Sequence, residues 1–198
     1  MSEQSEPAAD DMEAPEPAPL DEQDQGELLR IARIAVKQWL LSGTLPPGKP
    51  HRATLLQPAS VFVTIHVEGS LRGCIGRLEA DLPLYRAVME LAVSAATRDP
   101  RFLPLRAEEA REARFELSVL SPSRRVAGAE AIAVGTHGLV VTRGHRRGLL
   151  LPQVAVEHRW DRETFLAETC RKAGLPPEAW REDDTLVESF TAQVFGER

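Results

Sequence analysis

Hydrophobic and polar positions alternate most regularly over residues 61–67. Valine or isoleucine occupies every odd position of this stretch, and other side chains occupy the even positions. Successive side chains of a strand point to opposite faces, so the pattern predicts a strand with one strongly apolar face. Residues 68–70 are typical of a turn, and residues 71–76 are therefore predicted to return as the second strand of a hairpin.

Helical spacing of apolar residues predicts three main helices. The first covers residues 27–41, where apolar residues three or four positions apart share one face. The second begins near Pro83 and ends before Asp99-Pro100, because proline suits the start of a helix and disfavours helix in the residue before it. The third covers residues 161–173 and is expected to be capped by Asp161 and ended by Gly174.

The remaining stretches predict further strands and define the fold class. Residues 115–119 alternate, a short charged helix is expected at 105–112, and further strands are expected near residues 130–134, 138–142, 148–151 and 186–195. Helices and strands are interleaved without strict alternation, and hairpins occur. The sequence therefore predicts an α/β protein of the α+β type, with a mixed, largely antiparallel sheet and flanking helices.

Residues 1–26 differ in composition from the rest of the chain. They hold nine acidic residues and four prolines but no lysine or arginine. Such a segment cannot bury enough apolar surface to offset the entropy of ordering, so we expect a disordered acidic tail at 1–26 and a folded domain at 27–198. The formal net charge of −6 follows from this tail, because the other residues combine all 24 basic residues with 21 of the 30 acidic ones.

Two further features predict a cytoplasmic location. No stretch of about 20 apolar residues is present to span a membrane, and the N-terminus lacks the basic and apolar regions of a secretory signal. The chain contains two cysteines. In a protein that is not exported, we expect them to be free thiols.

One of these cysteines lies in the stretch Leu71-Arg72-Gly73-Cys74-Ile75-Gly76. The length of the preceding loop decides which face carries Cys74, because a slip of one residue moves every side chain to the other face. A two-residue loop at 69–70 would place Cys74 on the apolar face. A three-residue loop at 68–70, which pairs Val67 with Leu71, keeps the apolar residues together and is the predicted register.

In this register Thr64, His66, Arg72 and Cys74 share the polar face of the hairpin. A guanidinium at Arg72 would favour the reactive thiolate of Cys74, and His66 would be a base or a second cation. We therefore expect Cys74 to be alkylated at neutral pH and Arg72→Ala to weaken this reactivity.

A structural interpretation of the same stretch is also open. Gly73 and Gly76 weaken a strand, which indicates a close backbone approach, a bulge or room for a ligand. Free cysteine is among the most buried residue types, so Cys74 would then pack beneath a helix. Cys170 falls on the apolar side of the helix at 161–173 and is expected in the core.

The stretch at 71–76 is similar to the signature of the AMMECR-domain family, whose bacterial members are called AmmeMemoRadiSam system protein A. Other stretches in the same order agree with the family: Asp99-Pro100-Arg101-Phe102, Ser118-Val119-Leu120, Gly135-Thr136-His137-Gly138-Leu139, residues 148–155 and Trp160. The resemblance covers about residues 25–196, and Leu103 departs from it where the family is expected to prefer proline. It implies a larger and a smaller lobe with a cleft between them.

The resemblance also implies partners but no defined reaction. The bacterial genes of the family often accompany a Memo-like protein and a radical S-adenosylmethionine (radical SAM) protein, which implies a shared modification pathway. One hypothesis is therefore a cysteine-dependent enzyme or accessory factor in that pathway. The alternative is a non-catalytic module that binds a protein or a substrate, with the acidic tail as an interaction arm.

The enzyme hypothesis assigns a role to each candidate residue. Cys74 is the nucleophile, Arg72 stabilises its thiolate, and His137 or His66 is the base. The binding residues for an unidentified small or peptide substrate are Gly73, Gly76, Arg101 and Gln153, with Arg101 on an anionic group. Asp99 and Arg101 have the alternative of forming an ion pair at the end of the helix, and Gln153 that of capping the next helix.

Other classes of function find little support in the sequence. A basic hairpin tip at 143–147 lacks the aromatic residues that stack on nucleic-acid bases, so a solvated turn explains it better. The histidines and cysteines show no short metal-ligand spacing, and no glycine-rich phosphate loop is present. The sequence identifies no cofactor.

Overall fold

The computed structural model describes residues 19–197. A seven-stranded sheet has the order β2-β1-β3-β7-β5-β6, with β4 paired to β7, and every strand pair is antiparallel. The strands are β1 (Ser60–Val67), β2 (Ser70–Arg77), β3 (Arg114–Leu120), β4 (Arg124–Arg125), β5 (His137–Arg143), β6 (Arg146–Leu150) and β7 (Leu186–Gly196). The helices are α1 (Glu22–Ser42), α2 (Leu84–Thr97), α3 (Glu109–Glu112), α4 (Pro152–Glu157) and α5 (Arg162–Lys172), with short 3₁₀ helices at Ala53–Leu56, Ala129–Ala131 and Ala179–Arg181.

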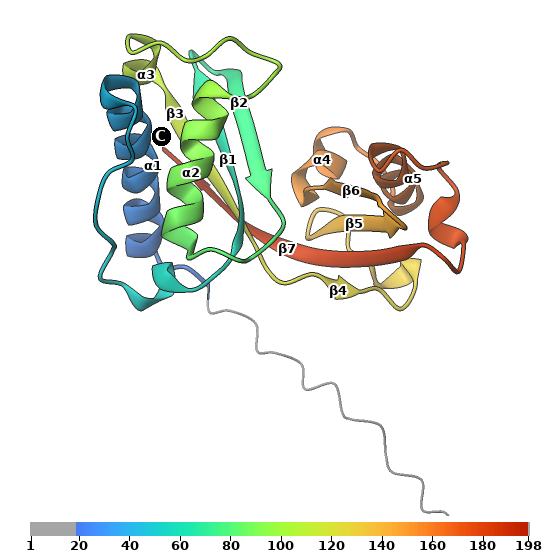
Figure 1. Ribbon diagram of the computed structural model, residues 1–198. Coiled ribbons are helices and arrows are strands. Elements are labelled where there is room, and N and C mark those ends of the chain that lie inside the picture. Colours follow the sequence, from blue (N-terminus) through green and yellow to red (C-terminus); the bar gives the residue numbers. More distant parts are fainter. Residues whose placement is uncertain (1–18, 198) are drawn as a thin grey trace, which may run out of the picture.

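The elements form a larger and a smaller lobe joined by β7 (Figure 1). In the larger lobe, α1 and α2 cover one face of β1, β2 and β3. In the smaller lobe, α4 and α5 accompany β5 and β6. The C-terminal part of β7 pairs with β3 and its N-terminal part with β5, so one strand belongs to both lobes. The predicted α+β class, antiparallel sheet and two lobes are confirmed.

Each lobe has its own apolar core, and a third cluster lies where the lobes meet. The larger core includes Leu28, Ile65 and Phe115, and the smaller one includes Phe165. The third cluster combines Leu120 of β3, Val140 of β5 and Phe190 of β7, with Phe62, Leu78, Leu149, Leu151 and Ala192 packed against them. This shared cluster fixes how the lobes sit against each other.

Helix α1 begins earlier than the composition predicts. It starts at Glu22, where the Asp21 side chain accepts a hydrogen bond from the Asp24 backbone N–H at 2.8 Å. Asp24 is buried, and its carboxylate accepts from Arg52 and from Thr54 Oγ1. Acidic residues at 22–26 are therefore part of the folded lobe, and the tail predicted at 1–26 is too long. Residues 1–18 lie outside the described part of the chain.

The β1–β2 hairpin differs from the prediction only at its turn. Val67 pairs with Ser70, so the turn is the two-residue Glu68-Gly69, whose φ angles are 51° and 76°. His66 lies opposite Leu71 but Ile65 lies opposite Gly73, which leaves Arg72 as the extra residue of a β-bulge. The bulge compensates for the shorter turn, so Thr64 still pairs with Cys74 as predicted.

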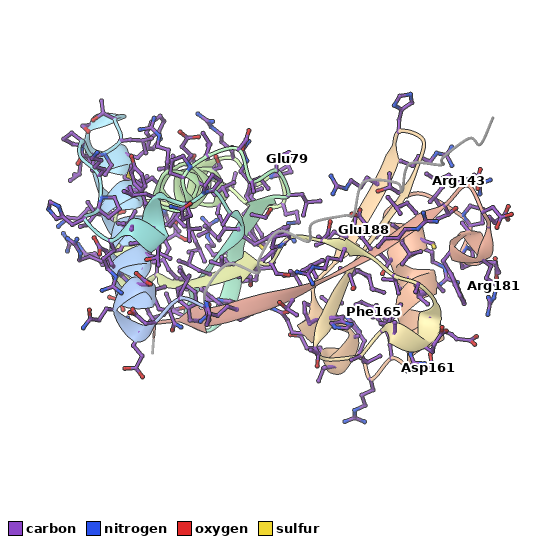
Figure 2. The ribbon with its side chains drawn as sticks, turned by 90° about the horizontal axis from the view of Figure 1, so that it is seen from below. Glu79, Arg143, Asp161, Phe165, Arg181 and Glu188 are labelled. Atoms are coloured by element: carbon purple, nitrogen blue, oxygen red, sulfur yellow. The ribbon has the colours of Figure 1, made fainter. Side chains whose placement is uncertain are left out.

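Predictions for the smaller lobe are mostly confirmed. Asp161 caps α5 through the Thr164 N–H at 2.8 Å, and Gly174 follows the helix with a φ of 72°. Figure 2 shows Asp161 at the start of this helix and Phe165 one turn later. The strand predicted at 130–134 is wrong, because this segment forms a 3₁₀ helix and a turn, and Ile132 enters the core without a partner strand.

No helix in residues 19–197 is both long enough and apolar enough to cross a membrane.

Candidate functional site

Cys74 lies on the edge strand β2, on the sheet face opposite its neighbour Gly73, which packs on α2. Its backbone groups point outward, away from β1, because both bond to side chains of the loop that follows α2. Cys74 and Thr64 are therefore a non-hydrogen-bonded pair, whose side chains lie closer than those of a bonded pair. Thr64 Oγ1 donates to Cys74 Sγ at 3.2 Å, and Cys74 is partly exposed.

Asp99 and Arg101 hold the outer edge of β2 at Cys74. The Asp99 carboxylate accepts from the Cys74 backbone N–H at 2.8 Å, and Arg101 Nη2 donates to the Cys74 carbonyl at 3.3 Å. Together the two side chains replace the neighbouring strand that an edge strand lacks. We call this pair the edge clamp.

The edge clamp is also an ion pair. Arg101 donates to Asp99 through Nη2 at 2.7 Å and through Nε at 3.0 Å. The guanidinium, followed by the backbone N–H groups of Cys74 and Arg101, holds the pKa of the Asp99 carboxyl well below its usual range despite its burial. In turn Asp99 raises the pKa of Arg101, to which Cys74 makes a smaller contribution.

The two members of the clamp differ in accessibility. The Asp99 side chain is 2% exposed and the Arg101 side chain 55% exposed. Arg101 therefore presents a permanent positive charge to solvent beside Cys74, in a position to bind an anionic group. The sequence predicted this role for Arg101, and it also predicted the helix-end ion pair with Asp99 as the alternative. The structure combines the ion pair with a position beside the thiol.

Arg72 does not fill the position beside Cys74 that its sequence spacing suggested. Its Nε and Nη2 donate to the Glu109 carboxylate at 2.9 and 3.2 Å, and its Nη1 donates to the Leu103 carbonyl at 2.6 Å. The β-bulge gives Arg72 this direction, because the extra residue leaves the regular alternation of faces. Arg72 thus ties β2 to α3, and it lowers the pKa of Glu109.

Neither candidate histidine makes a hydrogen bond to Cys74 within residues 19–197. His66 lies on β1 two residues from Thr64, opposite Leu71 and Arg114. His137 starts β5 in the smaller lobe, and its Nδ1 accepts from the Ala133 N–H at 3.2 Å, which closes the preceding turn. His66 therefore lies in the same lobe as Cys74, whereas His137 lies in the smaller lobe and bonds to a residue of its own turn.

The two glycines around Cys74 permit close packing. A Cβ at Gly73 would lie 2.1 Å from the carbonyl oxygen of Ala95 in α2, so this glycine lets strand and helix approach each other. A Cβ at Gly76 would lie 2.1 Å from the Phe62 ring, which covers this glycine from the facing strand. Ligand binding by either glycine stays a prediction, as it does for Gln153 in the first turn of α4.

Cys170 has the opposite environment. It is fully buried in α5 and packs in an apolar cluster with Val141 and Leu175. Burial raises the pKa of its thiol. The prediction that Cys170 belongs to the core is confirmed, and the chain thus contains a buried thiol with which Cys74 can be compared.

The sequence did not single out Thr64 or Glu109 as contributors to this region. A signal for Thr64 existed, because the predicted register already placed it opposite Cys74. No such signal existed for Glu109, whose contact with Arg72 spans 37 positions of the chain. No group of three or more histidine, cysteine or acidic side chains in residues 19–197 is arranged to hold a metal ion.

Comparisons with known proteins agree along most of the chain. The AMMECR1 family model matches residues 29–195. Protein MK0488 of Methanopyrus kandleri is 45% identical, over 88% of this chain and 89% of its own length. A protein of Methanothermobacter thermautotrophicus is 44% identical, over 91% of this chain and 97% of its own length. The crystal structure of the uncharacterized protein PH0010 from Pyrococcus horikoshii is 43% identical, with a TM-score of 0.82 over 87% of this chain and 90% of that one.

Proposed function

The chain belongs to the AMMECR1 family, and from this premise we propose that it acts through the Cys74 thiol. Its role is that of a cysteine-dependent enzyme or accessory factor in a cytoplasmic modification pathway. Memo-like and radical SAM proteins are its partners, as the resemblance of residues 71–76 implies.

One observation carries the proposal: the partly exposed residue Cys74 sits on an edge strand whose backbone two side chains hold in place. Thr64 Oγ1 donates to this sulfur, which stabilises negative charge on it. Arg101 adds a solvent-accessible positive charge. A thiolate beside a guanidinium suits nucleophilic attack on a substrate that carries an anionic group.

The proposal assigns the base to His66 rather than to His137. His66 is two residues from Thr64 on β1, about 6.6 Å along the strand at a rise of about 3.3 Å per residue. His137 belongs to the smaller lobe, and its Nδ1 is already bonded to Ala133. A substrate bound between the thiol and His66 would bring the two groups into reach of one another.

A comparison of cells tests this function. Strains carrying Cys74→Ala, Cys170→Ala or a deletion of the gene are compared by profiling their metabolites and modified peptides. We expect Cys74→Ala to reproduce the profile of the deletion and Cys170→Ala to match the wild type at equal protein levels. Deletion of the Memo-like or the radical SAM gene should change the same species.

The opposite result would identify a binding module. If Cys74→Ala matches the wild type while the deletion does not, the thiol only packs and the proposed chemistry is wrong. If the two partner deletions change unrelated species, the shared pathway is wrong even where Cys74 is required.

A further inference from the structure

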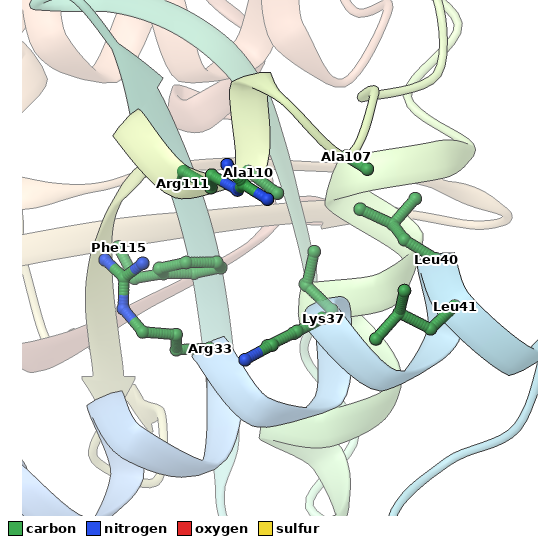
Figure 3. Close-up of a pocket in the computed structure, with 9 residues that line it drawn as sticks. Arg33, Lys37, Leu40, Leu41, Ala107, Ala110, Arg111 and Phe115 are labelled. Atoms are coloured by element: carbon green, nitrogen blue, oxygen red, sulfur yellow. The ribbon is translucent and has the colours of Figure 1, made fainter.

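A pocket with an apolar floor lies between α1, α3 and β3, beside the C-terminal half of α1. Its volume is about 380 Å³. The floor includes Val36, Leu40 and Phe115, of which Val36 and Phe115 are almost fully buried. We call it the α1/α3 pocket. Figure 3 shows Leu40 and Leu41 on one side and the short α3 on the other.

Three cations and no carboxylate line the α1/α3 pocket: Arg33, Lys37 and Arg111. Arg33 is paired with Glu197 at 2.5 Å and lies 5.2 Å from the centre of the Phe115 ring. Lys37 and Arg111 make no side-chain hydrogen bond or ion pair within residues 19–197. The pocket therefore suits an occupant that carries an apolar side chain among acidic ones.

We propose that the occupant is this chain's own acidic segment, residues 10–16, with Met12 on the apolar floor. In Asp10-Asp11-Met12-Glu13 one large apolar side chain stands among three carboxylates, and Glu16 follows three residues later. Residues 1–18 contain no lysine or arginine, so nothing in the segment opposes its attraction to the cations of the pocket.

The length of the chain allows this docking. The pocket lies about 18 to 30 Å along α1 from Asp21, since Arg33 and Leu41 are 12 and 20 residues on and a helix rises about 1.5 Å per residue. The seven residues from Pro19 back to Met12 span up to about 24 Å when extended. With Pro19 taken as level with Asp21, Met12 of an extended segment comes level with Arg33 and Val36, at the near end of the pocket.

The cations of α1 match the path of the segment. Arg30, Arg33 and Lys37 are spaced by three and four residues and therefore follow one face of the helix towards the pocket. A segment that runs back along this face passes Glu16 near Arg30 and Arg33, and Glu13 near Lys37. Prolines at positions 15, 17 and 19 favour the extended conformation that this path needs.

Zero-length cross-linking with a carbodiimide tests the proposal on the full-length protein. The chain has only three lysines, Lys37, Lys49 and Lys172, so the products are few. Lys49 is the control for simple proximity, because it lies three residues before Arg52, which pairs with Asp21 and Asp24 at the start of α1. We expect cross-links from residues 10–16 to Lys37 to exceed those to Lys49 about tenfold, since docking raises the local concentration of carboxylates at Lys37.

Two variants and one change of salt separate docking from loose tethering. Met12→Gln should lower the Lys37 cross-link several-fold, whereas Met12→Leu should preserve it. At 1 M NaCl, where the screening length falls to about 3 Å, the Lys37 cross-link should decrease strongly. Equal or stronger cross-linking to Lys49 would overturn the proposal. So would Lys37 cross-links that join labelled to unlabelled chains in a mixture, because the occupant would then be a second copy.

Discussion

Gly73→Ala is expected to lower the free energy of unfolding by about 3–5 kcal/mol, which is in the range of the most damaging single substitutions. The added Cβ would lie 2.1 Å from the Ala95 carbonyl oxygen and 2.9 Å from its carbonyl carbon. Both are backbone atoms of α2, so no side chain can rotate away, and strand and helix must separate. Since β2 carries Cys74 as the next residue, the substitution would also displace the candidate site.

Urea denaturation followed by circular dichroism measures this effect, and two glycines provide the comparison. Gly76→Ala should cost less, because its new Cβ meets the Phe62 ring, which can move. Gly26 is exposed within α1 and has no atom near its added Cβ, so Gly26→Ala should stabilise by about 0.5–1 kcal/mol. A stability loss below about 1 kcal/mol for Gly73→Ala would contradict the close approach of β2 to α2.

Asp99→Asn is expected to lower the free energy of unfolding by about 2–4 kcal/mol at pH 7, because a buried carboxylate that accepts several hydrogen bonds loses its charge and leaves donors without an acceptor. The carboxylate accepts from the Cys74 N–H and from the backbone and guanidinium of Arg101. An amide offers one acceptor oxygen in its place and directs an NH₂ group at donors. Asp81→Asn is the matched control, since Asp81 is 58% exposed in its ion pair with Arg77 and should lose almost nothing.

The contribution of Asp99 depends on pH in a defined direction. Its pKa in the folded protein is lowered, chiefly by Arg101, relative to about 3.9 in the unfolded chain. The stabilisation is therefore complete above about pH 5 and is lost as the pH falls below about 4 towards the folded value. Denaturation curves of wild type and Asp99→Asn should differ most at neutral pH and converge in acid. A difference that grows in acid would contradict the edge clamp.

The main outline of the fold was readable from periodicity because its strands have one buried face. Val61, Val63 and Ile65 recur at every second position and are all fully buried, so the hairpin and the pairing of Thr64 with Cys74 could be predicted. The length of the turn could not be predicted. A two-residue turn with a bulge and a three-residue turn give the same pairing of β1 with β2 from Ile65 back to the start of β1. Leu71, which the longer turn would have buried, is 40% exposed.

The sequence was sufficient to predict the central residue of the candidate site, Cys74, but not the side chains that surround it. The six-residue stretch identified Cys74, and strand spacing then favoured Arg72 as its cation. The bulge turns Arg72 towards Glu109, and Arg101 takes its place from a loop 27 positions away. Contacts of this length depend on how α2 packs on the sheet, which local spacing cannot show. The same limit explains α1, whose acidic start is stabilised by Arg52 from a distant loop.

The rate at which iodoacetamide modifies each cysteine at pH 7 tests most directly the claim that the edge clamp makes Cys74 the reactive thiol. We expect Cys74 to react about a hundred times faster than the buried Cys170, which serves as the internal reference. Arg101→Gln should slow the reaction of Cys74 several-fold, whereas Arg72→Ala should leave it unchanged, because the Arg72 guanidinium is bonded to Glu109. A Cys74 as slow as Cys170 in the folded protein, or slowed by Arg72→Ala and not by Arg101→Gln, would contradict this claim.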